Sequence, residues 1–189
     1  MAHSGREVEI KLPVKSAATA RRLLRAAGFE VIKRRVFESN VIFDTPALDL
    51  RRRGALIRLR EAGGGAVVTY KGPPKITRHK SREELETGIG DARVVAKILR
   101  RLGYVPGFRY EKYRTEFQRH GDSGVAMLDE TPAGVFLELE GPARWIDATA
   151  RELGFAKRDY ITASYVRLHL ERGGSPDSMR FHRSPASKS

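Results

Sequence analysis

The chain has 189 residues, of which 36 are lysine or arginine and 23 are aspartate or glutamate, and its formal net charge at pH 7 is +13. It contains no cysteine, which excludes disulfides, thiolate zinc sites and cysteine nucleophiles. Its length and its 40% content of hydrophobic residues predict one globular domain with a sizeable core.

The expected elements follow from hydrophobic periodicity and from the glycines and prolines that interrupt it. In chain order they are a strand at 7–14, a helix at 16–27, an extended segment at 31–44, a short helix or loop at 48–53, a hairpin of 55–61 with 66–72, a strand at 77–87, a helix at 91–102, extended chain at 104–119, a hairpin of 125–130 with 134–141, and helices at 144–153 and 161–171. Residues 1–171 form the predicted domain. The Gly/Ser/Pro-rich residues 172–189 predict a disordered basic tail.

Six short segments place a charged residue, or in one case a threonine, at every second position, and they are residues 7–11, 58–60, 69–71, 80–86, 112–114 and 138–140. A strand alternates its side chains between two faces, so each segment directs charge to one face and mostly apolar side chains to the other. Acidic pairs occur near both ends of the chain and basic pairs between them, whereas a surface adapted only for solubility mixes the signs.

These features predict an α+β fold, an antiparallel β-barrel with flanking helices. If the apolar faces pack outward against the helices, the charged faces line the lumen. A lumen of paired charges is costly unless a ligand or metal completes it, which indicates an anion site.

Seven motifs occur in a fixed order along residues 5–171. They are Glu7-x-Glu9-x-Lys11, Leu-Arg-Leu-Arg with Arg58 and Arg60, Thr-Tyr-Lys-Gly-Pro with Lys71, Lys80-x-Arg82-x-Glu84-x-Glu86, Tyr-x-Lys112-x-Arg114, Leu-Asp129-Glu-Thr-Pro-x-Gly and Phe-x-Glu138-x-Glu140-Gly. A closing Ala-Ser-Tyr holds Ser164 and Tyr165. In this ordered set the chain resembles the CYTH proteins, members of the triphosphate tunnel metalloenzymes, which include class IV adenylate cyclases, thiamine triphosphatases and inorganic triphosphatases.

The resemblance implies a tunnel that binds a triphosphate together with Mg²⁺ or Mn²⁺. Arginine and lysine suit phosphate oxygens, so the expected phosphate-binding residues are Lys11, Arg58, Arg60, Lys71, Lys80, Arg82, Lys112 and Arg114. Hard cations prefer oxygen ligands. The expected metal ligands are first Glu7, Glu9, Glu138 and Glu140, and next Asp129, Glu84 and Glu86. Lys11 and Glu9 are the expected catalytic residues, and Lys11, as a lysine among other cations, is expected to have a lowered pKa.

Some of these residues have a second interpretation. Glu84 and Glu86 also suit a role in neutralising neighbouring arginines, and Lys80 is equally compatible with a solvent-exposed position. Glu38 and Asn40 are candidates for the lumen. The five histidines, which are His3, His79, His120, His169 and His182, have no metal-like spacing and are assigned to the surface.

The expected function is that of a metal-dependent enzyme acting on inorganic triphosphate, thiamine triphosphate or ATP, most simply by hydrolysis. The alternatives are a class IV adenylate cyclase, which makes cyclic AMP and pyrophosphate, and a non-catalytic polyphosphate or nucleotide sensor. The charge of +13 also suits a nucleic-acid-binding protein, although no RNP-like strand or zinc finger supports that interpretation. With no secretory signal and no apolar run of membrane-spanning length, we expect a soluble, cytoplasmic protein without a membrane partner. Relatives often form dimers, so the resemblance also raises the expectation of a homodimer.

Overall fold

The computed structural model describes residues 3–181, which form ten strands, five α-helices and one 3-10 helix. The strands are β1 (His3–Val14), β2 (Glu30–Asp44), β3 (Leu56–Ala62), β4 (Gly65–Lys71), β5 (Lys75–Ile76), β6 (Lys80–Ile89), β7 (Val105–Gln118), β8 (Val125–Thr131), β9 (Gly134–Glu140) and β10 (Ser178–Met179). The helices are α1 (Ala17–Ala26), α2 (Asp49–Arg52), α3 (Ala92–Arg101), α4 (Ala143–Glu152), α5 (Tyr165–Glu171) and the 3-10 helix η1 (Lys157–Asp159).

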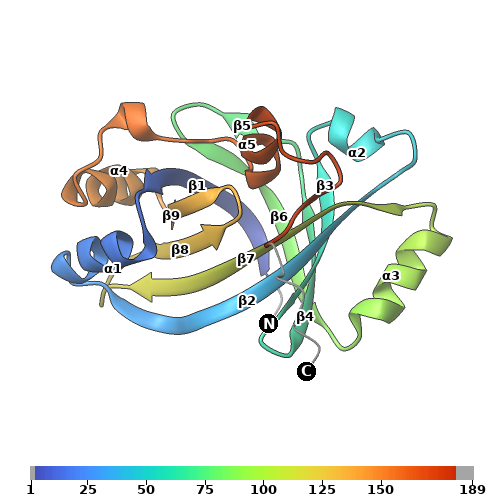
Figure 1. Ribbon diagram of the computed structural model, residues 1–189, viewed down its shortest axis with the longest axis horizontal. Helices are drawn as coiled ribbons and strands as arrows, with labels where there is room; N and C mark the ends of the chain where they lie inside the picture. Colours follow the sequence, from blue (N-terminus) through green and yellow to red (C-terminus); the bar gives the residue numbers. More distant parts are fainter. Residues whose placement is uncertain (1–2, 182–189) are drawn as a thin grey trace, which may run out of the picture.

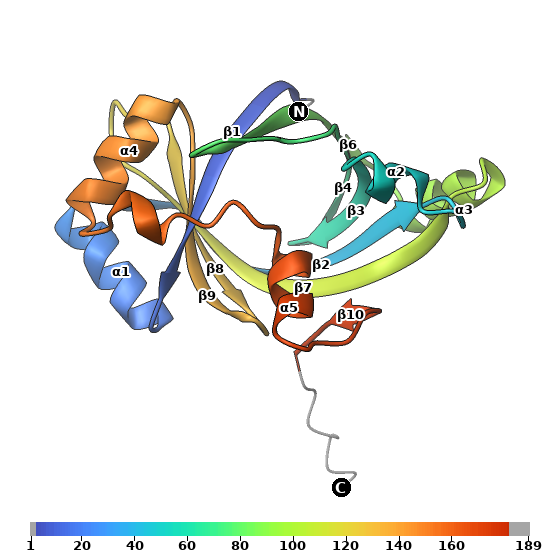
Figure 2. The ribbon, with the colours of Figure 1, turned by 90° about the horizontal axis from the view of Figure 1, so that it is seen from above.

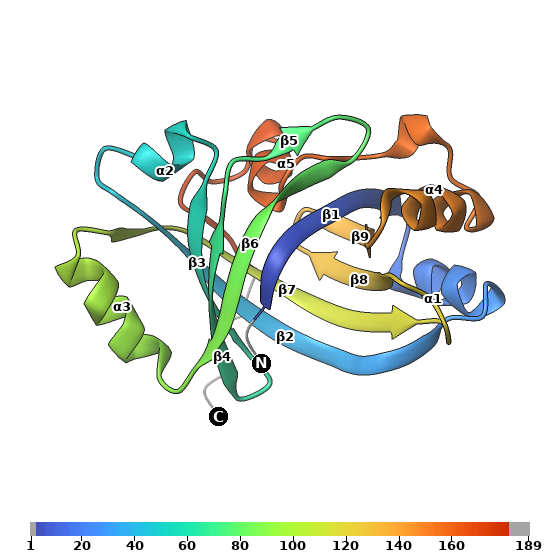
Figure 3. The same ribbon diagram turned by 180° about the vertical axis from the view of Figure 1, so that it is seen from behind.

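Eight of the strands close into an antiparallel barrel, in the order β1-β9-β8-β7-β2-β3-β4-β6 and back to β1 (Figure 1). Strand β1 closes the barrel by using a different partner at each end. Its residues 3–9 pair with β6, and its residues 9–14 pair with β9. Figure 3 shows β6 beside β1 at this closure. The predicted α+β fold with an antiparallel barrel is therefore confirmed.

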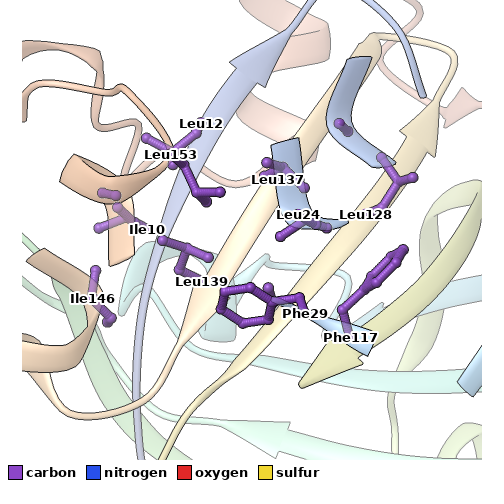
Figure 4. Packing of buried hydrophobic residues seen from close by; sticks show 13 residues of the cluster. Ile10, Leu12, Leu24, Phe29, Phe117, Leu128, Leu137, Leu139, Ile146 and Leu153 are labelled. Carbon is purple, nitrogen blue, oxygen red and sulfur yellow. The ribbon is translucent and has the colours of Figure 1, made fainter. Parts of the chain in front are cut away.

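The largest core lies on the outer face of β1, β8 and β9, under α1 and α4 (Figure 2). Ile10 and Leu12 of β1 and Leu137 and Leu139 of β9 are fully buried there, and Leu24 of α1 packs among them (Figure 4). Burying each of these side chains contributes about 1.5–3 kcal/mol. The apolar face of these strands points outward, so their charged face points into the barrel.

A second core lies at the other end of the barrel, where α3 covers β3 and β4. Leu99 of α3 packs there against Leu59 of β3 and Phe43 of β2. A third cluster joins α5 and β10 to the barrel through Tyr165, Leu168 and Met179.

Side-chain caps mark the starts of α1 and α3. The Ser16 side chain accepts a hydrogen bond from the Thr19 amide at 3.1 Å, and Asp91 caps α3 in the same way. The prediction of one helix over 161–171 is wrong at its start. Ile161 forms two backbone hydrogen bonds with Lys11, each 2.9 Å, and α5 begins only after Ser164, which caps it.

Part of the predicted tail lies within the described residues. Strand β10 runs parallel to β7, and its Met179 is fully buried against Tyr110 and Tyr165. Residues 178–179 are thus ordered because an apolar side chain anchors them, a contact that Gly/Ser/Pro composition does not reveal. Residues 182–189 lie outside the described residues, and the division into a domain and a tail stays a prediction. Within residues 3–181, no helix is both long enough and apolar enough to cross a membrane.

Candidate functional site

The inner face of the barrel surrounds a cavity of about 1370 Å³ lined by charged side chains from β1, β3, β4, β6, β7 and β9. Of the fifteen residues predicted for the site, fourteen line this cavity, and the fifteenth, Asp129, is fully buried beside it. Strand alternation places residues two apart on the same face, and closure of the barrel brings these faces together from distant parts of the sequence.

Lys11 lies at the centre of the first group of ion pairs. Its Nζ is 2.9 Å from Oε1 of Glu9 and 3.2 Å from Oε2 of Glu138. Lys80 Nζ contacts the same Oε1 of Glu9, so one carboxylate oxygen receives two ammonium groups. Lys80 is 5% exposed, which decides against the solvent-exposed interpretation.

The two lysines differ in how firmly they hold their protons. Burial alone would lower the pKa of Lys11, but the carboxylates of Glu138 and Glu9 outweigh it and raise that pKa above its ordinary value. The expected lowering of the Lys11 pKa is therefore wrong, because its nearest neighbours are anions. Burial, with help from Lys11 and Arg82, instead lowers the pKa of Lys80 to about 8. Lys80 is thus the lysine that changes charge near neutral pH.

A second group lies where β1, β4 and β6 meet. Lys71 Nζ is 2.6 Å from Glu7 Oε1 and 3.0 Å from Glu84 Oε2. Arg82 donates from Nε to the other oxygen of Glu7 at 3.1 Å. Glu84 therefore neutralises a buried lysine here.

A third group joins β3 to β6 and β7. Arg60 donates to both oxygens of Glu86 at 3.0 and 3.1 Å, and Arg58 donates to Oε2 of Glu86 at 3.3 Å. The Thr69 hydroxyl also donates to this oxygen at 2.7 Å. Arg58 is 3.5 Å from the Tyr110 hydroxyl, which lines the same cavity. Glu86 thus pairs with arginines, as the second interpretation of this residue expected.

Asp129 is enclosed by donors. Arg114 binds it through Nε at 2.7 Å and Nη2 at 2.6 Å, Lys112 through Nζ at 2.9 Å, and the Tyr165 hydroxyl at 2.8 Å. Arg114 also reaches Oε1 of Glu138 at 3.0 Å. With its side chain fully buried and three residues donating to it, Asp129 is better placed to orient Arg114 and Lys112 than to bind a metal.

Two side chains of β2, Glu38 and Asn40, are buried behind the residues that line the cavity. Glu38 lies 3.6 Å from Lys112 and 3.9 Å from Arg60, and the carboxyl pKa is lowered to about 2, because these cations outweigh its burial. Asn40 is 1% exposed, and neither polar atom of its side chain has a hydrogen-bond partner among the described residues. Both were candidates for the lumen because relatives often carry polar residues in this segment, whereas Thr69 was recognisable only as the residue two before Lys71.

Glu140 differs from the other predicted acidic residues. Within residues 3–181 no lysine, arginine or histidine nitrogen lies within 4.0 Å of its carboxylate, whereas each of the other six has such a partner. Burial, with the nearby carboxylates of Glu7 and Glu138, raises the pKa of Glu140 to about 7. A carboxylate held near other carboxylates without a counter-ion is a chemical fit for a hard divalent cation.

The other predicted metal ligands do not form a preformed metal site among the described residues. Among the described residues, no three aspartate, glutamate or histidine side chains are grouped so as to hold a metal ion. The reason is that Glu7, Glu9 and Glu138 each turn toward a lysine or arginine. A phosphate ligand would compete for those same cations.

Part of the cavity lining is apolar. Leu56 lies two residues from Arg58 on β3, and Phe108 lies two residues from Tyr110 on β7. Each therefore shares a strand face with a polar residue of the site, and both line the cavity. Leu48, Val166 and Leu170 also line the cavity, beside the charged residues Arg51, Arg167 and Glu171 of the same segments. Leu48 adopts a left-handed backbone conformation (φ 58°), which is uncommon for a leucine.

One histidine was wrongly assigned to the surface. The side chain of His79 is 12% exposed, and its Nε2 lies 2.8 Å from Oδ1 of Asp147. His79 lies directly before the Lys80 motif and belongs to no alternating pattern, so the sequence did not predict its burial. The burial becomes visible only from the contact between this turn and Asp147 of α4.

The barrel is closed, and its lumen is lined by paired cations and carboxylates. The CYTH domain model matches residues 5–165, and the chain belongs to this family. A relative from Methanocaldococcus jannaschii, named putative adenylate cyclase, is 35% identical over 174 residues, which cover 86% of this chain and 97% of the relative.

Solved structures share the fold. A putative adenylate cyclase from Vibrio parahaemolyticus superposes with a TM-score of 0.74 at 24% identity, over 88% of this chain and 98% of its own. A Pyrococcus horikoshii protein gives a TM-score of 0.72 at 26% identity, over 88% and 99%. A protein from Hippeastrum, described as a putative adenylyl cyclase with a dominant triphosphatase activity, gives 0.64 at 21% identity, over 89% and 97%.

Proposed function

We propose that this protein is a metal-dependent enzyme that hydrolyses a triphosphate inside the barrel. The observation that carries the proposal is the lumen itself, in which every predicted phosphate-binding cation is paired with a carboxylate. The half-buried Glu140, in contrast, has no cation within 4.0 Å among residues 3–181. Anion binding alone needs the cations but not the surplus carboxylate.

The cations provide the phosphate site. Arg58, Arg60 and Arg114 offer planar donor groups that suit two phosphate oxygens at once, and Lys71 and Lys112 offer point charges. Because the acidic partners already hold these side chains in place, little conformational entropy is lost when phosphate replaces a carboxylate. The transferred phosphoryl group carries negative charge that such a fixed array stabilises.

Glu140, Glu138 and Glu7 are the residues we assign to a divalent cation, Mg²⁺ or Mn²⁺. Burial, together with the proximity of Glu7 and Glu138, raises the Glu140 pKa. The bound cation would withdraw charge from the phosphate oxygens and offset the repulsion between substrate and carboxylates.

Glu9 and Lys11 are the predicted catalytic residues, and Lys11 contacts Glu138 of the proposed metal site. Burial opposes the charge of Glu9, but Lys11 and Lys80 outweigh it and lower its pKa well below the ordinary value, so Glu9 remains an acceptor that orients both lysines. Lys11, with its raised pKa, stabilises charge on the leaving phosphate. Lys80, with a pKa of about 8, is better suited to pass a proton to the leaving oxygen.

A second candidate is a class IV adenylate cyclase, in which the ribose 3′-hydroxyl of ATP attacks the α-phosphorus. Two observations favour it. A cavity of about 1370 Å³ exceeds the range of roughly 300–1,000 Å³ typical of small-molecule sites, and its lining includes apolar side chains, among them Leu56 and Phe108, that suit an organic group. The name of the Methanocaldococcus jannaschii relative agrees with this candidate, whereas the description of the Hippeastrum protein agrees with hydrolysis.

Product analysis separates the candidates. The protein is incubated with inorganic triphosphate, thiamine triphosphate or ATP in the presence of Mg²⁺ or Mn²⁺, and orthophosphate, pyrophosphate and cyclic AMP are resolved. Hydrolysis releases orthophosphate and stops when the metal is chelated. Cyclic AMP appearing with pyrophosphate would replace hydrolysis by cyclisation, and binding without any product would favour the sensor.

A further inference from the structure

Outside the lumen, three side chains from distant parts of the sequence meet on one carboxylate oxygen. His79 Nε2 lies 2.8 Å from Oδ1 of Asp147, and the Tyr160 hydroxyl donates to the same oxygen at 3.1 Å. His79 lies just before β6, Asp147 lies in α4, and Tyr160 follows η1. We name these three residues the clasp.

The clasp lies where the wall of the barrel changes partner. Glu9 and Lys80 are the last residues paired between β1 and β6. Two residues further along β1, Lys11 exchanges backbone hydrogen bonds of 2.9 Å with Ile161 instead. The segment that follows η1 therefore takes the place of β6 beside β1, and Tyr160 and His79 border this junction from its two sides.

His79 and Tyr160 are each linked to a lysine of the site through the backbone. His79 directly precedes Lys80, and Tyr160 directly precedes Ile161, the backbone partner of Lys11. Both lysines donate to Oε1 of Glu9. The geometry points to His79, Asp147 and Tyr160 as positioning residues that hold Lys80 and Lys11 together on Glu9. This inference rests on the proposed function, because it gives these lysines a part in turnover.

The protonation of the clasp suits this role. Burial opposes the charge of Asp147, but the hydrogen bonds from His79 and Tyr160 outweigh it and lower the Asp147 pKa, so the residue stays a carboxylate that accepts both bonds. Burial and the bond to Asp147 raise the pKa of Tyr160 to about 12, so its hydroxyl stays a donor. A carboxylate cannot donate, so Nε2 of His79 carries the hydrogen of this bond.

The test measures kcat and KM for inorganic triphosphate, with melting temperature as a check on folding. His79→Ala is expected to lower kcat roughly 10- to 100-fold, the scale of a misplaced catalytic group, with KM changed less than about threefold. His79→Gln, whose amide can reach the place of Nε2, should recover kcat to within about threefold of wild type. The matched control is Arg78→Ala, which removes an exposed cation 3.8 Å from Asp147 and should leave kcat unchanged.

Tyr160→Phe removes the other arm. Because the three residues act as a unit, the His79→Ala/Tyr160→Phe double variant should lose little more than the larger single loss. A His79→Ala variant that melts at a lower temperature yet keeps wild-type kcat would overturn the proposal, since that is the behaviour of a purely structural contact. Equal losses in His79→Gln and His79→Ala would overturn it as well.

Failure of the proposed function is distinguishable from failure of the clasp. A wild-type protein that turns over no triphosphate contradicts the function, and the clasp is then judged by amide hydrogen exchange. The Lys11 and Ile161 amides should exchange roughly tenfold faster in Tyr160→Phe than in Arg78→Ala, because the first variant loosens the segment that bonds them. Equal exchange rates in the two variants would overturn the clasp.

Discussion

Replacing Glu140 by glutamine should stabilise the metal-free protein at alkaline pH and leave it unchanged at acidic pH. Burial, with Glu7 and Glu138, raises the pKa of this carboxyl from its ordinary 4.5 to about 7. The folded state therefore resists ionisation of Glu140. The stability that comes from keeping it neutral is complete below pH 4.5 and is lost as pH rises to 7.

The size of the effect follows from the pKa. At 1.36 kcal/mol per pKa unit, a rise from 4.5 to about 7 corresponds to about 3 kcal/mol, and partial exposure of the carboxylate reduces this to about 1–3 kcal/mol. For a chain of this length, 1 kcal/mol shifts the melting temperature by roughly 2–4 °C. Glu140→Gln should therefore melt roughly 2–12 °C above wild type at pH 8.

The assay is thermal unfolding at pH 5 and pH 8, with and without Mn²⁺. The matched control is Glu83→Gln, which removes an exposed glutamate of the same barrel. Mn²⁺ should raise the melting temperature of wild type and of the control at pH 8, but not that of Glu140→Gln. A difference between Glu140→Gln and wild type that is the same at both pH values would refute the reasoning.

Three further predictions concern other parts of the cavity. In wild type, triphosphate affinity measured by calorimetry should fall as pH rises through 8, because Lys80 loses its charge, whereas Lys80→Arg should keep its affinity; parallel profiles would contradict this. Asp129→Asn leaves Lys112 and Arg114 buried without their carboxylate and should cost about 3–5 kcal/mol in urea unfolding, so wild-type stability would argue against its structural role. Leu170→Asp should raise KM for thiamine triphosphate or ATP roughly tenfold and leave KM for inorganic triphosphate unchanged; equal effects would contradict an organic-group site at the apolar lining residues.

The barrel and the composition of its lumen were predictable from the sequence because strand alternation is a local property. Glu7-x-Glu9-x-Lys11 places three charges on one face wherever that strand is, and the ordered repetition of such patterns predicted a shared interior. What alternation cannot predict is which charges pair. Lys11 faces Glu138 and Glu9, so its pKa is raised, whereas burial, with Lys11 and Arg82 nearby, lowers the pKa of Lys80.

The features that the sequence concealed all depend on contacts between elements distant along the chain. His79 belongs to no periodic pattern, and its burial follows from the approach of Asp147 on α4. Met179 is one apolar residue in a segment of tail-like composition, yet it is fully buried against Tyr110. Asp129 matched a motif of metal enzymes, whereas its three donors are visible only once the strands are paired.

The central claim is that the cations of the lumen bind the phosphates and that its carboxylates bind the metal ion. Its most direct test measures Kd and kcat for inorganic triphosphate with Mn²⁺ in Arg58→Ala and Glu138→Gln. We predict that Arg58→Ala weakens binding roughly 10- to 100-fold and largely keeps kcat, because a charged hydrogen bond contributes about 1.5–3 kcal/mol. We predict that Glu138→Gln binds within a few-fold of wild type but loses turnover. Retained turnover in Glu138→Gln would contradict the account.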